Sequence, residues 1–407
     1  MFLVALTARN SALIEAAVVL HQEGRIPANS YVLDLDAIES NARTFAAEAD
    51  RLGLTTFAMT KQIGRNPPAL DAMGRGGIGS CVAVDMAGAR AVHGAGHHVG
   101  HVGHLVQVPR AEAAAAARLG ADYWTVFSVD KAAEAADAAR RAGRTQALLL
   151  RVHEPGDTFY MGHEGGFPLA DLRAAVEQVQ RLDGVRIAGV VTFPALLYSH
   201  ESRDVFLTPN CETMRKAAAV LAEFGISDVQ CNLPGTTSTA VLERLAGAGA
   251  TQVEPGHGLT GTTPLHAVRE LPEVPAVLYL SEVAHAHDGR AYCFGGGLYI
   301  DPVFPGYQVT ALVGSDPAQA MGNRLDATLP PPGAIDYYGL LDPGGGTMPG
   351  TGDSVVFGFR PQAFVTQAYV VPLAGVATGD PRPDGIWHPN GTPAAWPGPK
   401  PAEDAHG

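Results

Sequence analysis

Short runs of consecutive apolar residues recur along the first two thirds of the chain, separated by alanine-rich stretches with helical spacing. The runs are rich in Val and Leu and mostly lack polar alternation, which is typical of parallel strands covered on both faces. They fall at residues 55–59, 78–83, 99–107, 123–127, 146–152, 185–193, 227–232 and 250–254. Strands that alternate with helices over roughly 200 residues predict a (β/α)8 barrel of the TIM type.

Helix start and stop signals agree with this alternation. Asp36 and Glu39 have the spacing of a capping box at the head of an amphipathic segment. Farther along, Thr208 is predicted to cap a helix that has Pro209 in its first turn and stops at Gly225.

The pattern changes near residue 266, where strand-like runs follow one another without long helices. This indicates a second, all-β domain. We therefore expect four parts: an N-terminal helical segment at 1–30, a barrel at 31–265, a β domain at 266–375 and a tail at 376–407. The tail is rich in proline and glycine, which predicts irregular structure.

Composition narrows the range of functions. The chain has 407 residues, 46% hydrophobic and 17% charged, which is enough for a large core. Its net charge of -13 argues against nucleic acid or an anionic membrane as the main partner. The apolar opening is interrupted by Arg9 and Glu15, so we expect a helix there and not a signal peptide. The chain carries no run of about 18 uncharged apolar residues.

The four cysteines are far apart and form no CxxC motif. They are typical of reduced thiols, and the expected location is the cytoplasm.

Candidate chemistry lies at the ends of the predicted strands, where barrel enzymes carry their active sites. Lys61 follows the first strand in "FAMTKQIGRNPPAL", Arg151 ends the fifth, Phe193 ends the sixth and Glu254 ends the eighth. A lysine at the end of a buried strand is costly unless it has a partner or a covalent role.

The stretch "PGTTST", 234–239, is a turn of glycine and hydroxyl residues that leads into a predicted helix. Such a turn suits a phosphate, although it also suits an ordinary helix cap. It does not match the P-loop pattern, so a nucleotide is not expected. Glu254 either pairs with a neighbouring cation or serves the ring nitrogen of a phosphorylated cofactor.

Several motifs together resemble a known family. "TKQIGRNP" after "YVLDLDAIESNA" is similar to the alanine racemase-like, fold type III pyridoxal-phosphate (PLP) enzymes, and "EPGH" is similar to a Glu-Pro-Gly-Arg motif of the decarboxylases in that fold. "GHVGHLVQVPR", "EGGFPL", "EPGHGLTGTTPLHA" and "SEVAH" resemble the YhfX-like branch of amino-acid racemases. The resemblance covers about residues 30 to 375 and implies an alanine racemase-like barrel followed by a β domain.

The resemblance also implies roles for individual residues. Lys61 would form the imine with PLP, and its burial would favour the nucleophilic free amine. Glu254 would keep the pyridine nitrogen protonated, Phe193 would stack on the ring, and Arg151 would lie near the phenolic oxygen. The phosphate would be held by residues of two turns and one strand of the β domain: Gly235, Thr236, Thr237, Ser238, Gly256, His257 and Tyr369.

The sequence departs from the family pattern in two places. Alanine racemases carry an arginine at the pyridine nitrogen, where Glu254 stands here, and a catalytic tyrosine in the β domain. The matching segment here is "AYCFGGGLY", with Phe294 near the tyrosine's place. Cys293 is the first candidate for the second catalytic group, with Tyr292 and Tyr299 as alternatives.

The histidines of "GHHVGHVGHLVQV" invite a metal interpretation. On a regular strand His98 and His104 share one face and His97 and His101 the other, so they do not converge without a bulge. We predict packing or hydrogen bonding for them and no metal. The D-threonine aldolases of this fold use a His-x-Cys pattern that is missing here.

The leading hypothesis is a PLP-dependent amino-acid racemase, a homodimer in which Lys61 serves one face of the substrate and a β-domain residue of the second subunit serves the other. The alternative is a decarboxylase or another Cα lyase, which Glu254 favours. A third possibility is a PLP carrier without catalysis, but the long β domain argues against it.

Overall fold

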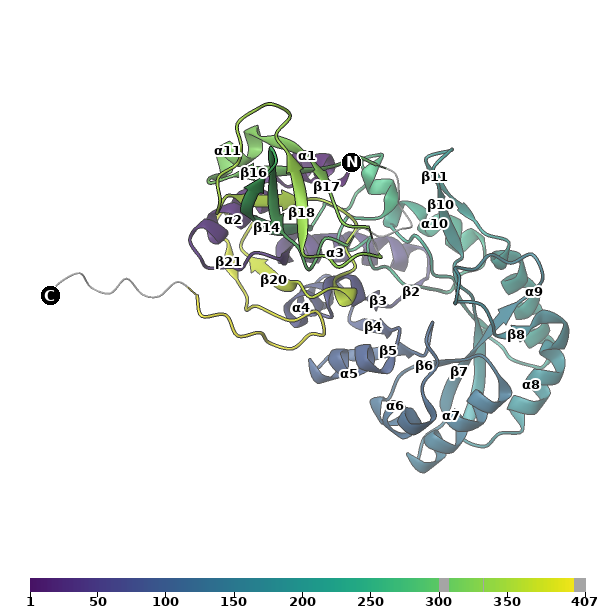
Figure 1. Cartoon of the computed structure of the whole chain (residues 1–407). Coiled ribbons are helices and arrows are strands. Elements are labelled where there is room, and N and C mark those ends of the chain that lie inside the picture. Colours follow the sequence, from purple (N-terminus) through teal and green to yellow (C-terminus); the bar gives the residue numbers. More distant parts are fainter. Residues whose placement is uncertain (300–306, 332, 399–407) are drawn as a thin grey trace. The chain divides into compact units, whose positions relative to one another are not determined.

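The computed structural model describes residues 1–299, 307–331 and 333–398. The chain divides into two compact units (Figure 1). The barrel unit comprises residues 42–60 and 73–258, and the β unit comprises residues 1–41, 61–72 and 259–407.

A parallel, barrel-shaped sheet forms the centre of the barrel unit. Its strands, in spatial order, are β2 (Thr55–Thr56), β13 (Gln252–Val253), β12 (Gln230–Asn232), β9 (Val185–Val191), β7 (Gln146–His153), β6 (Tyr123–Val126), β5 (His98–Val102), β4 (Ser80–Ala83) and β3 (Ala58–Met59). The order begins and ends on β2 and β3, which are separated only by Phe57, so the sheet closes almost completely on itself. The Phe57 amide donates to the Val253 carbonyl at 3.0 Å across the seam. The predicted barrel is thereby confirmed.

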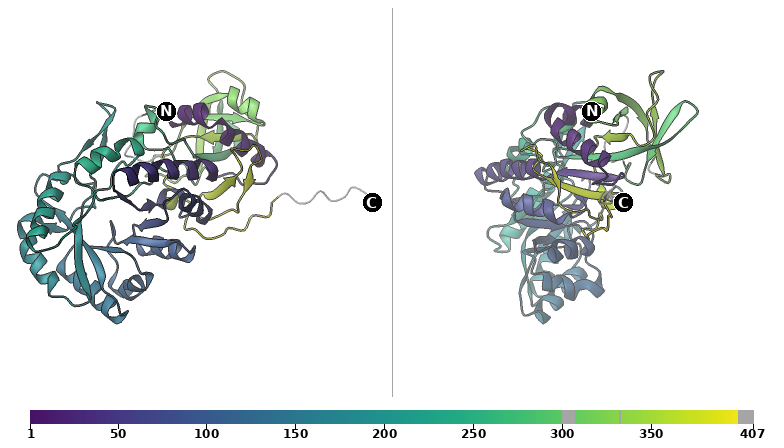
Figure 2. Two further views of the ribbon diagram at one scale, coloured as in Figure 1. Left: turned by 180° about the vertical axis from the view of Figure 1, so that it is seen from behind. Right: turned by 90° about the vertical axis from the view of Figure 1, so that its left-hand side faces the viewer.

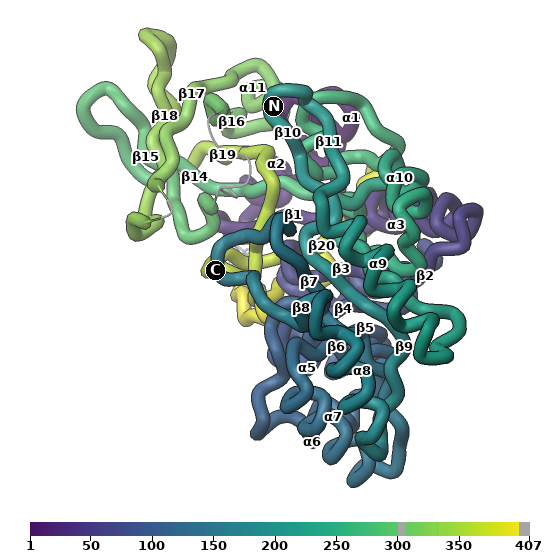
Figure 3. The backbone as a smooth tube through the Cα atoms, turned by 90° about the vertical axis from the view of Figure 1, so that its right-hand side faces the viewer, coloured from purple at the N-terminus to yellow at the C-terminus, as the bar shows by residue number. Residues whose placement is uncertain are grey.

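Helices alternate with these strands along the chain, as Figure 1 shows. They are α5 (Met86–Gly94), α6 (Ala113–Leu119), α7 (Val129–Arg141), α8 (Leu172–Gln180), α9 (Asn210–Glu223) and α10 (Leu242–Gly247). In α7 the buried face consists of alanines, because small side chains let a helix approach the sheet closely. The unit also carries β8 (Phe167–Pro168), paired with β7, and a hairpin of β10 (Leu196–Ser199) and β11 (Asp204–Leu207) (Figure 3).

The β unit is built on a mainly antiparallel sheet. Its strands, in spatial order, are β15 (Arg290–Phe294), β18 (Tyr338–Asp342), β17 (Arg324–Thr328), β16 (Val309–Gly314), β19 (Ser354–Phe357), β14 (Val277–His287), β1 (Ser30–Asp34), β20 (Tyr369–Ala374) and β21 (Arg382–Pro383). Because β14 also pairs with β15, six of these strands close into a ring. The short helix α11 (Pro317–Gly322) connects β16 to β17.

Two N-terminal helices, α1 (Phe2–Arg9) and α2 (Ser11–Gln22), pack against this sheet. In both views of Figure 2 they lie beside the green strands of the same unit. Leu13 and Ile14 join Leu280 and Val356 in one buried cluster. In the described part of the chain no single helix is long and apolar enough to cross a membrane. Helices α1 and α2 reach the necessary length and apolar composition only when taken together, and the chain bends by 94° between them.

Two predicted helix caps differ from the structure. Helix α3 (Leu35–Arg51) begins before Asp36, and the carboxylate of Asp34 accepts the Ala37 amide at 3.0 Å. The cap therefore lies at the end of β1. The Thr208 hydroxyl donates to the Pro194 carbonyl at 2.7 Å and does not cap α9.

The described part of the tail contains ordered contacts. Trp387 pairs with Val370 of β20, and β21 pairs with the end of the same strand. Residues 399–407 lie outside the described residues.

We predict that Leu13→Ala in α2 lowers the free energy of unfolding by about 2–5 kcal/mol, because it leaves a cavity in a core where Leu13 is fully buried. Val19→Ala in the same helix is the matched control; Val19 is 39% exposed and the loss should stay near 0.5 kcal/mol or less. Urea unfolding of both variants measures the difference. Equal losses would contradict the packing described here.

Candidate active site

The barrel unit gathers polar side chains at the carboxyl ends of its strands. Glu254 follows directly after β13, Asn232 ends β12, and Arg151 lies in the second half of β7. His101 and Thr125 lie in the second halves of β5 and β6. Because the strands are parallel, their carboxyl ends meet at one rim, which is where barrel enzymes place their chemistry.

Glu254 lies at the centre of a buried hydrogen-bond network. Its Oε1 accepts from His101 Nδ1 at 2.7 Å and from Asn232 Nδ2 at 3.0 Å. His104 Nε2 lies 3.3 Å from the other oxygen, Oε2. The side chains of Glu254, His101 and His104 are each at most 1% exposed.

The ionisation of Glu254 follows from these neighbours. Burial alone would raise its pKa, but the charge of His104, the hydrogen bond from His101 and that from Asn232 outweigh burial and hold the pKa below its usual value. Glu254 is therefore an anion at neutral pH. Its Oε2 makes no hydrogen bond of acceptable geometry within the described residues.

The two histidines converge because β5 is irregular. The pairing with β4 slips at Gly100: Cys81 pairs with Val99, whereas Val82 pairs with His101. A Cβ at Gly100 would lie 2.1 Å from Ser80 Oγ, so the extra residue must be a glycine. Gly103, with φ of 75°, then ends the strand. On a regular strand His101 and His104 were expected to point to different faces unless a bulge intervened. The structure contains such a bulge, and it brings the two side chains together.

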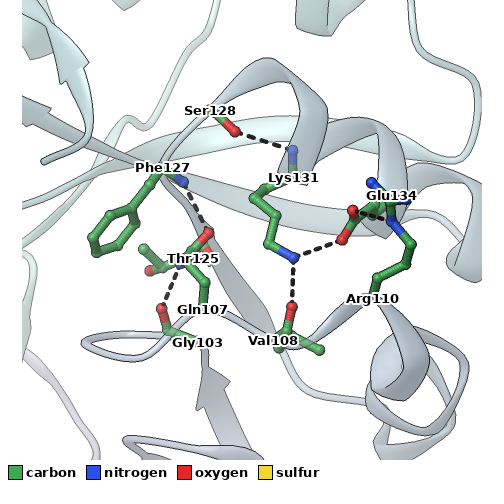
Figure 4. Close-up of polar contacts among 9 residues, drawn as sticks. All are labelled: Gly103, Gln107, Val108, Arg110, Thr125, Phe127, Ser128, Lys131 and Glu134. Atoms are coloured by element: carbon green, nitrogen blue, oxygen red, sulfur yellow. Dashed lines mark hydrogen bonds and ion pairs between the residues drawn. The ribbon is translucent and has the colours of Figure 1, made fainter.

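Neighbouring strands hold this arrangement in place. His101 Nε2 lies 2.6 Å from the Thr125 hydroxyl. The Gln107 amide donates to the carbonyls of Gly103 and Thr125, both at 3.1 Å, and its oxygen accepts the Phe127 amide (Figure 4). Gln107 thereby ties the turn before His104 to strand β6.

Arg151 is a buried cation with unused donors. It is 0% exposed; its Nη2 donates to the carbonyls of His163 and Phe193, both at 3.0 Å. Nε and Nη1 have no hydrogen-bond partner in the part of the chain that the structure describes. The guanidinium lies 5.3 Å from the ring centre of Phe127 and 5.7 Å from that of Phe159. Burial lowers the pKa of Arg151 to about 10, so it stays charged at neutral pH.

Phe193 belongs to an aromatic cluster at the same rim. It contacts His104 edge to face at 5.9 Å between ring centres. Tyr160 and His163, from the loop after β7, lie 5.6 Å and 5.8 Å from it. These two residues were missed by the sequence analysis, because a loop's composition does not show which strand end it covers.

The two predicted phosphate turns adjoin each other. A Cβ at Gly258, just after Gly256 and His257, would lie 2.4 Å from the Thr237 carbonyl oxygen. Ser238 is 0% exposed, does not cap the turn Thr239–Val241 that follows it, and its hydroxyl has no partner among the described residues. The helix beyond, α10, has only six residues, so the polar groups of the turns matter more than a helix dipole.

Lys61, Tyr369 and Cys293 belong to the β unit. Lys61 opens a 3-10 turn, Lys61–Ile63, after which Gly64 and Arg65 adopt positive φ angles of 67° and 50°. Asn66 then caps helix α4 (Pro67–Arg75) by accepting the Ala69 amide at 3.1 Å.

Lys61 and Tyr369 each lie near aromatic rings of the β unit. The Lys61 ammonium lies 5.3 Å from the ring centre of Phe364. Tyr369 contacts two rings of the tail, His388 at 5.9 Å and Trp396 at 6.4 Å.

Cys293 does not have the properties of a proton donor. It is fully buried, with its thiol 3.6 Å from the Gly339 carbonyl oxygen, and burial raises its pKa to about 12. A reactive thiol needs access and a lowered pKa. The structure therefore favours the two alternatives. Tyr292 stacks on His285 at 4.6 Å, whereas Tyr299 lines a cavity of about 1070 Å³ in the β unit.

One cluster of three potential metal ligands is found among the described residues: His101, His104 and Glu254. His101 Nδ1 and Glu254 Oε1 are 2.7 Å apart, which is a hydrogen-bond distance. His104 Nε2 and Glu254 Oε2 are 3.3 Å apart.

Comparison with known proteins places this geometry in a family. Residues 33–264 match the alanine racemase N-terminal domain, and residues 278–382 match the YhfX-like C-terminal domain. The chain is 40% identical to the uncharacterized protein YhfX of Escherichia coli strain K12 over 387 residues, 94% of this chain and 96% of that protein. The chain belongs to the alanine racemase-like family, in its YhfX-like branch.

Several solved structures share the fold of this chain. D-threonine aldolase of Filomicrobium marinum is 20% identical and has a TM-score of 0.63, with 90% of this chain and 96% of that one covered. D-threo-3-hydroxyaspartate dehydratase of Delftia sp. HT23 is 19% identical, with a TM-score of 0.63 over 88% and 97%. Alanine racemase of Clostridium difficile 630 is 13% identical, with a TM-score of 0.63 over 88% and 98%.

We predict that the native protein resists thiol reagents. All four cysteines are buried, and burial is the main cause that raises the pKa of Cys293 and Cys81 to about 12 and of Cys211 and Cys231 to about 11. Ellman's reagent at pH 8 should modify less than one thiol per chain within minutes, and all four after unfolding in urea. Rapid modification mapped to Cys293 in the folded protein would contradict its burial and restore it as a candidate.

Proposed function

We propose that the chain is a PLP-dependent enzyme that acts at the Cα atom of an amino acid, and that the reaction is racemisation. Members of this fold family typically bind PLP. The observation that carries the proposal is the buried Glu254 carboxylate, which is ionised and keeps Oε2 free of strong hydrogen bonds at the rim of the barrel. An anionic acceptor of this kind suits a protonated pyridine nitrogen.

The residues present fit the cofactor in chemical type. Among the buried polar atoms without a hydrogen-bond partner in the described residues are Glu254 Oε2, the Nε and Nη1 donors of Arg151, and the Ser238 hydroxyl. They match a ring nitrogen, a phenolic oxygen and a phosphate, respectively. Phe193 would contact the ring face. The remaining phosphate ligands would be Gly235, Thr236, Thr237, Gly256, His257 and Tyr369.

The position of Lys61, which follows β3 at the carboxyl end of a barrel strand, supports it as the attachment point. The chain has four lysines, Lys61, Lys131, Lys216 and Lys400. Lys131 bonds to Glu134 and to the Val108 carbonyl (Figure 4), and Lys216 bonds to Glu154 at 2.6 Å. Lys400 lies outside the described residues.

The bound cofactor would act as an electron sink that acidifies the Cα–H bond. Lys61 would take or return the proton on one face. Racemisation requires a second donor on the other face, and we propose Tyr299, with Tyr292 as the alternative. Tyr299 adjoins a cavity that can admit a small molecule.

A lyase is the second candidate, and a specific observation favours it. Glu254 stands where alanine racemases carry an arginine, and a carboxylate there gives a stronger electron sink, which also serves decarboxylation and Cα–Cβ cleavage. Among the structures with this fold are a D-threonine aldolase and a D-threo-3-hydroxyaspartate dehydratase.

The family is typically homodimeric with amino-acid substrates. We propose the same here, with active sites shared between subunits in the cytoplasm.

We predict that Lys61 is the residue modified when protein supplied with PLP is reduced with borohydride. Peptide mapping should find the pyridoxyl group on Lys61 and none on Lys216, which serves as the internal control because it is half-exposed and ion-paired. Lys61→Met should take up no label. Labelling of another lysine, or none in the wild type, would exclude the assignment.

We predict that the PLP-loaded enzyme exchanges Cα hydrogen of at least one amino acid with deuterated water. Racemisation gives both enantiomers by chiral chromatography, and Tyr299→Phe should retain exchange of one enantiomer while racemisation falls at least about 100-fold. Release of carbon dioxide or an aldehyde would identify a lyase. Cofactor binding without exchange or product from any of the L- and D-amino acids would leave only the carrier.

A further inference from the structure

The carboxylate of Glu254 lies in a part of the barrel unit where an isolated charge is not tolerated. Removing a carboxylate from water costs several kcal/mol unless hydrogen bonds replace the lost hydration. The pKa of Glu254 is nevertheless lowered. The groups around Glu254 therefore stabilise its ionised form.

The hydrogen bonds are distributed unequally between the two oxygens. Oε1 receives two, from His101 and Asn232. Oε2 lies 3.3 Å from His104 Nε2 and has no hydrogen-bond partner of good geometry among the residues that the structure describes. This asymmetry fixes the rotation of the carboxylate and leaves one oxygen to accept a further donor.

Thr125 allows His101 to donate without being charged. With its proton on Nδ1, the neutral ring donates to Glu254, and Nε2, at 2.6 Å, accepts from the Thr125 hydroxyl. The hydrogen bond to Oε1 therefore needs no positive charge on the ring.

His104 connects the carboxylate to the aromatic residue expected against the cofactor. Its ring lies 5.2 Å from that of His101 and 5.9 Å, edge to face, from that of Phe193. Gln107 fixes the carbonyl of Gly103, the residue before it (Figure 4). His104 can thus move little without disturbing both Glu254 and Phe193.

We propose that His101 and His104 are positioning residues that, with Asn232, hold Glu254 as an oriented anion whose Oε2 receives the proton-bearing ring nitrogen of the cofactor. The inference rests on the proposed function and assigns to the "GHVGH" segment a role in the electronics of the cofactor. Neither histidine is required to touch the substrate.

The test uses PLP labelled with ¹⁵N in the ring, bound to the full-length protein, with the ring nitrogen observed by NMR at pH 7.5. In the wild type this nitrogen should be protonated. His101→Phe should lower the ratio of protonated to unprotonated ring at least tenfold, as should Glu254→Gln, and the double variant should add little. His101→Asn, which keeps a donor in the Nδ1 position, should restore most of the wild-type ratio.

His98→Gln is the matched control. His98 lies on the same strand, its side chain is 45% exposed, and it pairs with Asp122. This variant should leave the ring nitrogen unchanged. An unchanged nitrogen in folded His101→Phe and His104→Leu, with a changed one in Glu254→Gln, would overturn the inference. Stoichiometric zinc or iron in the purified protein, lost in His104→Leu, would also overturn it and make the cluster a metal site.

Failure of the proposed function gives a different result. In that case borohydride marks no lysine, and the cofactor experiment cannot be done. The hydrogen bonds remain testable without cofactor, by long-range ¹H–¹⁵N NMR of the histidine rings. A protonated Nδ1 on His101 whose resonance moves in Glu254→Gln supports the network, and protonation only on Nε2 refutes it.

Discussion

A carboxylate without water around it constrains the rim of the barrel. Glu254 stays ionised because the charge of His104 and the hydrogen bonds from His101 in β5 and Asn232 in β12 outweigh its burial. Those donors in turn require the slip at Gly100, the hydroxyl of Thr125 and the three bonds of Gln107. Removing one partner leaves a buried charge partly unpaired, which costs more than an ordinary hydrogen bond. Several residues that look unremarkable in the sequence therefore depend on a single side chain.

The same unit also keeps a cation that no carboxylate neutralises at close range. Arg151 forms no ion pair within 4 Å among the described residues, and its guanidinium lies near the rings of both Phe127 and Phe159. Aromatic faces lower the cost of burying a guanidinium but leave its donors unsatisfied. The barrel unit thus holds the Glu254 anion and the Arg151 cation without pairing them with each other. Such an arrangement suits a ligand whose ring carries both a hydrogen-bond donor and an acceptor.

Local patterns predicted the strands well and the site only in part. Residues 123–127 and 146–152 were expected as strands and form Tyr123–Val126 and Gln146–His153, because a continuous apolar run needs no distant information. The run 99–107 ends at Val102, since Gly103 turns the chain. The meeting of His101 with Glu254 and the burial of Cys293 depend on neighbouring strands, which spacing along one segment does not encode. The helix cap at Asp34 escaped prediction because β1 was not recognised as a strand.

The pairing of β1 limits the order in which the β unit can fold. Ser30–Asp34 lies between β14, Val277–His287, and β20, Tyr369–Ala374, with antiparallel and parallel register respectively. During synthesis the ribosome releases β1 and the apolar helices before it long before either partner exists. Segment β1 and these helices are therefore made well before the strands on both sides of β1, and their hydrophobic faces remain available to chaperones, or to other nascent chains, until β20 has been synthesised.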